Sequence, residues 1–144
     1  MGAFMSKNRL KIYYTISIVS LCFAVLGFGY NTWRLEQSEH NTTVRTASFE
    51  VIIAIAELEQ NIFAAVYDQD DVAGSPRIGW VKVGLIEQLS VLIDPKVAVA
   101  ADRLKQAWAN HWDEITNDEQ ALAIINERIS HLQSELKLVL KSLN

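Results

Sequence analysis

From residue 43 onward, apolar residues recur every three or four positions along the chain. This is the spacing of one face of an α-helix. The first run predicts a helix over 43–67. Nothing in the segment 34–42 breaks a helix, so this helix is expected to run on from the segment before it. Its predicted core face comprises Val51, Ile55, Leu58, Ile62 and Ala65, widened by Ile52, Phe63 and Val66.

The next apolar run follows the loop segment DQDDVAGS and is compatible with two structures. Trp80, Lys82 and Gly84 alternate with Val81, Val83 and Leu85, as residues on the two faces of a strand would. However, Ser75 is a residue type that caps helices, and Pro76 suits the first helical position. A helix is therefore favoured. Its predicted core face comprises Ile78, Val81, Leu85, Leu89 and Leu92. Gly79 and Gly84 each weaken it by about 1 kcal/mol relative to alanine, but they permit close packing.

Two further helices follow. Asp94 and Pro95 end the second helix and open the next turn. The third stripe is Val97, Ala101, Leu104, Trp108, Trp112 and Ile115. Thr116 and Glu119 have the spacing of a capping box, which predicts that the fourth helix begins there. The fourth stripe is Leu122, Ile125, Ile129, Leu132, Leu136, Val139 and Leu143.

The pattern therefore predicts an all-α chain. A single N-terminal transmembrane helix would be followed by an up-down-up-down four-helix bundle, because short connections favour antiparallel neighbours. The expected divisions are a basic N-terminus over 1–11, a transmembrane helix over 12–33, a connector over 34–42 and a bundle over 43–144.

The segment 12–33 contains no charged residue. As a helix its 22 residues would cover about 33 Å, close to the thickness of a hydrocarbon core. A cleaved signal peptide usually has a shorter apolar run. Three alternatives remain open at this level: cleavage after Gly29, lipidation at Cys22 and myristoylation at Gly2.

Charge predicts the orientation of this span. Three of the thirteen Lys and Arg residues precede it, and all seventeen Asp and Glu residues follow it. Positive flanks stay in the cytoplasm, so the C-terminal part is expected to be exported, into the periplasm if the source is bacterial. An acidic exported part excludes nucleic acid as the expected partner.

Two stripes of residues run along the predicted membrane helix. One is bulky and apolar. The other is small in the middle and polar at its ends, and it comprises Ser17, Ser20, Ala24, Gly27 and Asn31. Small residues let helix backbones approach in lipid, so this stripe is a candidate contact for another helix. The alternative is a plain anchor whose serines bond to their own helix.

No pattern of catalytic residues stands out, so we expect no enzyme, no cofactor and no metal site. Asp68, Asp70 and Asp71 begin like a calcium loop, but Val72 and Ala73 replace an oxygen ligand and the required glycine. Antiparallel helices would instead gather aromatic residues beneath acidic turns at the end far from the membrane. The residues expected at this docking or ligand end are Tyr67, Trp80, Trp108, His111 and Trp112. The alternative is an aromatic core plug beneath solvated acidic turns.

One span followed by a short helical bundle resembles half of a bacterial four-helix sensory module, in architecture only. The chain ends at Asn144 without a second span, so we expect it to need a partner to pass on a signal. The favoured function is a non-enzymatic, membrane-anchored interaction protein, either a small subunit or an accessory factor. Its expected partners are the bilayer and another membrane or envelope protein, or a second copy. The alternative is an exported module that binds a small molecule and reports through a partner.

Overall fold

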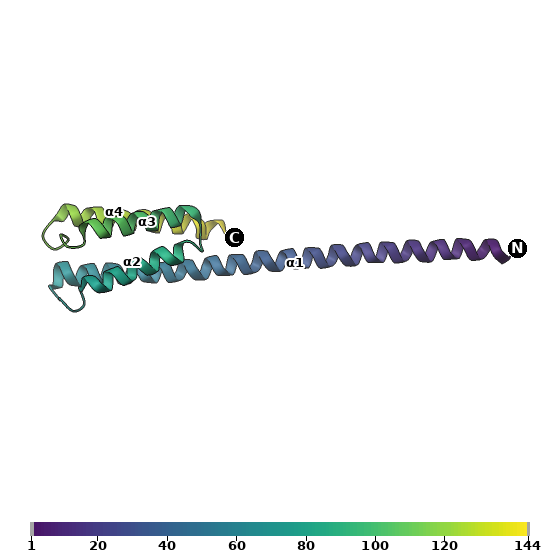
Figure 1. Ribbon diagram of the computed structural model, residues 1–144, viewed down its shortest axis with the longest axis horizontal. Coiled ribbons are helices and arrows are strands. Elements are labelled where there is room, and N and C mark those ends of the chain that lie inside the picture. The colour runs from purple at the N-terminus through teal and green to yellow at the C-terminus, as the bar shows by residue number, and fades with distance from the viewer. Residues whose placement is uncertain (1, 144) are drawn as a thin grey trace. The chain divides into compact units, whose positions relative to one another are not determined.

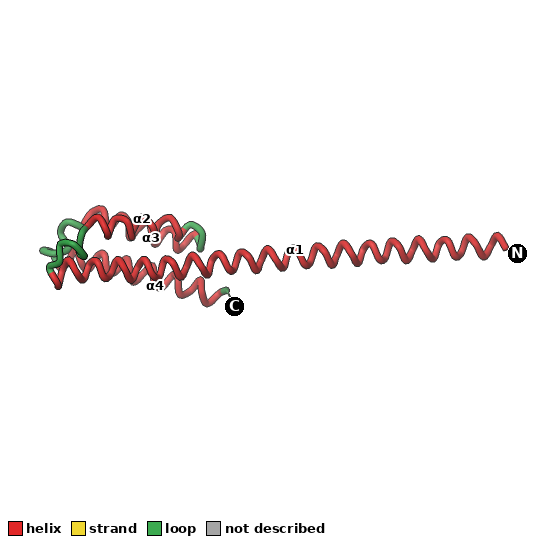
Figure 2. The backbone as a smooth tube through the Cα atoms, turned by 90° about the horizontal axis from the view of Figure 1, so that it is seen from below, coloured by secondary structure: helices red, strands yellow, loops and turns green. Residues whose placement is uncertain are grey.

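Helices make up all the regular structure of the described residues, and no strand occurs among them (Figure 2). The computed structural model describes the backbone of residues 2–143 and the side chains of residues 9–143. Predictions that concern the side chains of residues 1–8 lie outside this range. The chain divides into two compact units, Met1–His40 and Asn41–Asn144. The predicted all-α class is confirmed.

The first unit consists of the N-terminal part of helix α1, which runs from Gly2 to Phe63. The predicted continuation of this helix through 34–42 is confirmed. Near the N-terminus α1 is long and apolar enough to span a membrane. Every side chain over 12–33 is exposed in the structure. Three hydroxyls in or beside this segment donate to carbonyl oxygens four residues earlier, at 2.9–3.0 Å, which satisfies them within the helix.

The second unit is a helical bundle built from the end of α1 and three further helices (Figure 1). A π-helical turn, Ala64–Asp68, follows α1. Helix α2 spans Pro76–Ser90, α3 spans Pro95–His111 and α4 spans Glu119–Ser142. Side-chain contacts join neighbouring helices: Glu57 with Lys82, Glu87 with Lys105, and Glu59 with Gln133.

Aspartates cap two of these helices. The carboxylate of Asp94 accepts from the Lys96 N–H at 2.7 Å, and that of Asp118 accepts from the Gln120 N–H at 2.8 Å. The predicted capping box at Thr116 is wrong, because the first helical residue is Glu119 and Asp118 directly precedes it. Pro76 begins α2 as predicted, but the Ser75 side chain makes no capping hydrogen bond.

The core of the bundle follows the predicted stripes of α1, α3 and α4. The largest fully buried side chains include Leu58, Leu104, Trp108, Ile129 and Leu136. Two residues predicted to widen the α1 stripe lie outside the core: Ile52 is 39% exposed and Phe63 is 58% exposed. The remaining stripe residues are buried or half-buried and pack on one cluster.

The predicted core face of α2 is wrong. Its buried residues are Gly79, Val83, Ile86 and Ser90. Of the predicted face, Leu89 is half-buried, and the other four residues, Ile78, Val81, Leu85 and Leu92, are exposed. Gly79 explains the difference, because the six-membered ring of Trp108 occupies the space that a Cβ at residue 79 would need. Only a glycine admits this indole, so Gly79 must face the core.

Candidate functional site

The loop between α1 and α2 is held by side-chain contacts to its backbone. Asn61, which is buried, donates its amide N–H groups to the carbonyl oxygens of Ala73 and Ser75, at 2.7 and 3.1 Å. Asp70 accepts from the N–H groups of Val72 and Ala73, at 2.9 and 3.0 Å. These bonds stabilise the compact loop that stands over the end of α1.

Gly74 brings this loop against the π-helical turn. A Cβ on Gly74 would lie 2.5 Å from Ala65 Cα and 2.7 Å from the Asp70 carbonyl oxygen. The Gly74 N–H donates to that same carbonyl at 2.7 Å. A side chain at this position would push the loop away from Ala65.

The turn between α3 and α4 forms a second wall at the same end of the bundle. Its backbone bonds run from Glu114 N to His111 O at 3.0 Å and from Asp118 N to Glu114 O at 2.8 Å. Ile115 is buried beneath the turn, and Trp112 is half-buried against the core. The turn is therefore anchored to the core by its own apolar residues.

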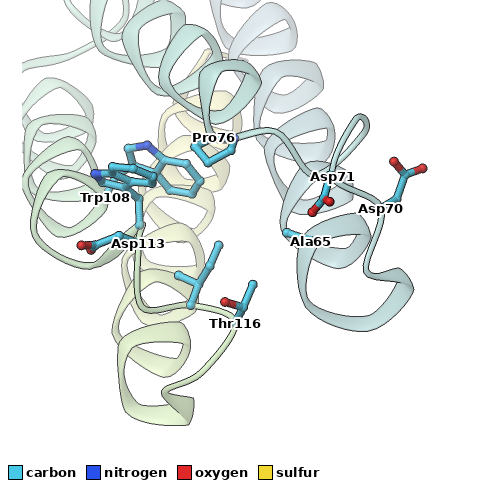
Figure 3. Close-up of a pocket in the computed structure, with 10 residues that line it drawn as sticks. Ala65, Asp70, Asp71, Pro76, Trp108, Asp113 and Thr116 are labelled. Carbon is cyan, nitrogen blue, oxygen red and sulfur yellow. The ribbon is translucent and has the colours of Figure 1, made fainter.

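A cavity of about 220 Å³ lies between these two walls (Figure 3). For comparison, a cavity of about 150 Å³ holds one benzene ring. One wall is the α1–α2 loop and the other is the α3–α4 turn, with tryptophan side chains beside Asp113. The lining residues are Ala65, Asp70, Asp71, Gly74, Pro76, Trp108, Trp112, Asp113, Ile115 and Thr116.

The charged residues that line this cavity are all acidic. Three of the ten lining residues are aspartates, and no lining residue is cationic. Asp71 and Asp113 form no ion pair within the described residues. The backbone N–H groups of Ala73 and Val72 lower the pKa of Asp70 below its ordinary value, so it stays ionised at neutral pH. The cavity therefore combines aromatic surface with three exposed aspartates.

The described residues contain no group of three or more His, Cys, Asp or Glu side chains placed to hold a metal ion. The carboxylates of Asp70 and Asp113 point outward on opposite sides of the cavity (Figure 3), so the three aspartates do not converge on one point. A compact divalent ion needs several oxygen ligands at 2.0–2.6 Å.

The structure separates the aromatic residues predicted to meet at this end. Trp108 and Trp112 both line the cavity, but Trp80, Tyr67 and His111 do not. Trp80 is 38% exposed on α2, and Tyr67 stacks near Phe63, with ring centroids 5.3 Å apart. His111 ends α3, half-buried, with Nδ1 3.8 Å from a carboxylate oxygen of Glu114.

The sequence predicts acidic turns above aromatic residues at this end of the bundle, but it does not predict most of the cavity wall. The sequence predicts Gly74 in a loop and Pro76 at a helix start, but it does not indicate that both line a cavity. The signal available was the loop sequence itself, in which a glycine between small residues marks a close backbone approach.

The small stripe of the first unit is exposed along its length, from Ser17 to Asn31. The Ser17 hydroxyl donates to the Tyr13 carbonyl at 2.9 Å, as the plain-anchor alternative expects. A Cβ at Gly27 would have no neighbour within 4 Å. The described chain therefore leaves room on this stripe for a second helix.

Comparison with protein-family models, with curated proteins and with solved structures found no match to this chain. We therefore infer function from the residues themselves.

Proposed function

We propose that this protein is a non-enzymatic, membrane-anchored helical interaction protein, a small subunit or accessory factor of a membrane or envelope complex. Its first unit would span the bilayer with the basic N-terminus in the cytoplasm. Its second unit would be an exported up-down-up-down bundle that carries the partner surface.

The observation that carries this proposal is an apolar stripe on the solvent side of α2. It comprises Ile78, Val81 and Leu85, which recur at helical spacing and are 37–61% exposed. Single exposed apolar residues are ordinary on a protein surface, but a contiguous set favours a binding surface. We call this set the α2 outer stripe.

Helix α1 extends the same surface. The ion pair between Glu57 and Lys82 places the two helices side by side. Ile53 precedes Glu57 by one turn on α1, and Leu85 follows Lys82 by one turn on α2. If the two helices are antiparallel, both residues lie on the same side of this ion pair. Ile53 is 53% exposed, and Phe49, one turn further, is 58% exposed. The α2 outer stripe would thus continue onto α1 as one apolar patch.

Site-specific photocrosslinking in native membranes tests this surface. A photoreactive residue at Val81 should give a discrete adduct, whereas one at Asp102, an exposed polar position of α3, should give none. Leu85→Glu should abolish the Val81 adduct while the bundle stays folded by circular dichroism, because residue 85 is 38% exposed and lies outside the core. Equal labelling from both positions, or none from Val81, would refute the surface.

The membrane stripe is a second contact in this proposal. Leucine at Ser20, Ala24 and Gly27 should break association, because bulky side chains keep helix backbones apart. Val19→Leu, on the bulky stripe, is the matched control and should leave association intact. Undiminished association of the triple variant would reduce the span to a plain anchor.

Orientation has its own test. Cys22 is the only cysteine, so a Cys22→Ser background allows single-site labelling. A membrane-impermeant maleimide should label Asn110→Cys in intact cells or spheroplasts, since Asn110 is exposed on the bundle. Labelling only after lysis would place the bundle in the cytoplasm and overturn the proposed orientation.

A second candidate function is a small-molecule-binding module. The cavity between the α1–α2 loop and the α3–α4 turn favours it, because two tryptophans and three aspartates are among its lining residues. This role is compatible with a partner surface, since the α2 outer stripe contributes no residue to the cavity.

A further inference from the structure

We propose that a second copy of this chain packs against the outer side of α1 in the bundle, with the two α1 helices parallel and in register. This inference rests on the proposed function, because it names the partner at the α1 edge of the apolar patch. The residues involved are Thr46, Phe49, Ile53, Ala56, Gln60 and Phe63, which we call the α1 outer face.

The α1 outer face has the pattern of a helix-pairing seam. Its six residues recur in steps of three and four, none of them is charged, and all of them are exposed. Phe49, Ile53 and Phe63 are 58%, 53% and 58% exposed, so no other helix of the described chain covers them. Positions a and d of a coiled coil have this spacing, and apolar residues there pack against a second helix.

Opposite charges flank the two sides of this face. In the same heptad, Arg45 takes position g and Glu50 takes position e. The two residues are about 140° apart around the helix, so they do not face each other within one chain. Neither forms an ion pair within the described residues, and Arg45 donates instead to the Leu143 carbonyl oxygen at 3.0 Å.

A parallel second copy would pair both charges at once. Across a parallel coiled coil, position g of one helix lies beside position e of the other. Arg45 of each copy would therefore meet Glu50 of the other, which gives two pairs related by a twofold axis. The next position e is Glu57, which already pairs with Lys82 and would face Ile52, an uncharged residue.

Orientation and self-complementarity select this occupant. An antiparallel pair would bring Glu50 of one copy against Glu57 of the other, and like charges repel. Two copies anchored with one orientation in the same membrane also present their α1 helices in parallel. A helix from an unrelated protein would need an acid and a base at the matching positions, whereas a second copy carries both.

The first test is disulfide crosslinking of the full chain in native membranes, in a Cys22→Ser background. Ile53→Cys should form a linked dimer of twice the chain's mass under mild oxidation, because identical seam residues meet across a twofold axis. Val99→Cys on α3, where Val99 is 51% exposed, is the control matched in exposure and should form little dimer. Equal crosslinking from both positions, or none from Ile53→Cys, would overturn the proposal.

Charge reversal then tests whether the partner is a second copy. Arg45→Glu and Glu50→Arg should each weaken self-association about fivefold or more, because two facing pairs change from attraction to repulsion. The readout is energy transfer between dye-labelled copies reconstituted at one protein-to-lipid ratio. Lys137→Glu, at an exposed position of α4, is the control and should leave association unchanged.

A mixture of the two variants gives the decisive result. Arg45→Glu chains and Glu50→Arg chains should associate with each other, because every facing pair is then opposite in charge. If the mixture stayed dissociated while circular dichroism showed both variants folded, the proposal would be overturned. A Val81 adduct to a different protein would still support the proposed function, so each proposal can fail alone.

Discussion

Gly79 and Gly84 lie on the same short helix, but replacing each with alanine should affect the stability of the bundle in opposite ways. A Cβ at Gly79 would overlap Trp108 Cζ2 and would lie 2.5 Å from its Cη2 and 3.0 Å from the Asn61 side-chain oxygen. A Cβ at Gly84 would have no neighbour within 4 Å. Alanine should therefore destabilise the first position relative to the second.

The magnitude follows from two opposing effects. Alanine in place of glycine favours a helix interior by about 0.5–1 kcal/mol, and this gain is common to both positions. Overpacking a filled core costs about 1–3 kcal/mol. Gly84→Ala should thus raise the free energy of unfolding by about 0.5–1 kcal/mol. Gly79→Ala should fall about 1–3 kcal/mol below Gly84→Ala, because the shared gain cancels in that difference.

The assay is urea unfolding of the full chain in mild detergent, followed by tryptophan fluorescence and by circular dichroism. Trp108→Phe provides the decisive background, because phenylalanine lacks the ring atoms that meet residue 79. In that background Gly79→Ala should be neutral or stabilising, although Trp108→Phe is itself destabilising.

One result would refute the reasoning. If Gly79→Ala stabilised the bundle as much as Gly84→Ala does, the indole would not be packed against α2. The account of why α2 turns its bulky stripe outward would then fail as well, since it depends on the contact between Gly79 and Trp108.

Three further predictions concern caps and loops. Asp118→Ala should cost about 1 kcal/mol of unfolding free energy and Thr116→Ala less than about 0.5 kcal/mol, measured by urea titration, because only Asp118 caps α4. Asn61→Ala should cost about 1–3 kcal/mol in the same assay, because it leaves two loop carbonyls without their donor. The lowered pKa of Asp70 means that its stabilisation is present above its unfolded pKa and is lost as pH falls through the folded value. Amide exchange at Val72 and Ala73, corrected for the intrinsic pH dependence, should therefore quicken in acid, and Asp70→Ala should remove that pH dependence.

The sequence by itself determined the helices and three of their four core faces. Leu58, Leu104 and Leu136 are buried because apolar residues at helical spacing must share one face, and no tertiary information is needed for that inference. It also determined the long apolar N-terminal helix, since a run without charges is a local property of the chain.

Tertiary structure decided the rotation of α2, the cap of α4 and the walls of the cavity. The α2 pattern offers two faces, and its bulkier one is more apolar, so periodicity alone selects Val81 and Leu85. Gly79 faces the core instead, because the indole of Trp108 on α3 fills the space that a side chain at residue 79 would need. Periodicity records which residues can share a face, but only packing decides which face fits the neighbouring side chains.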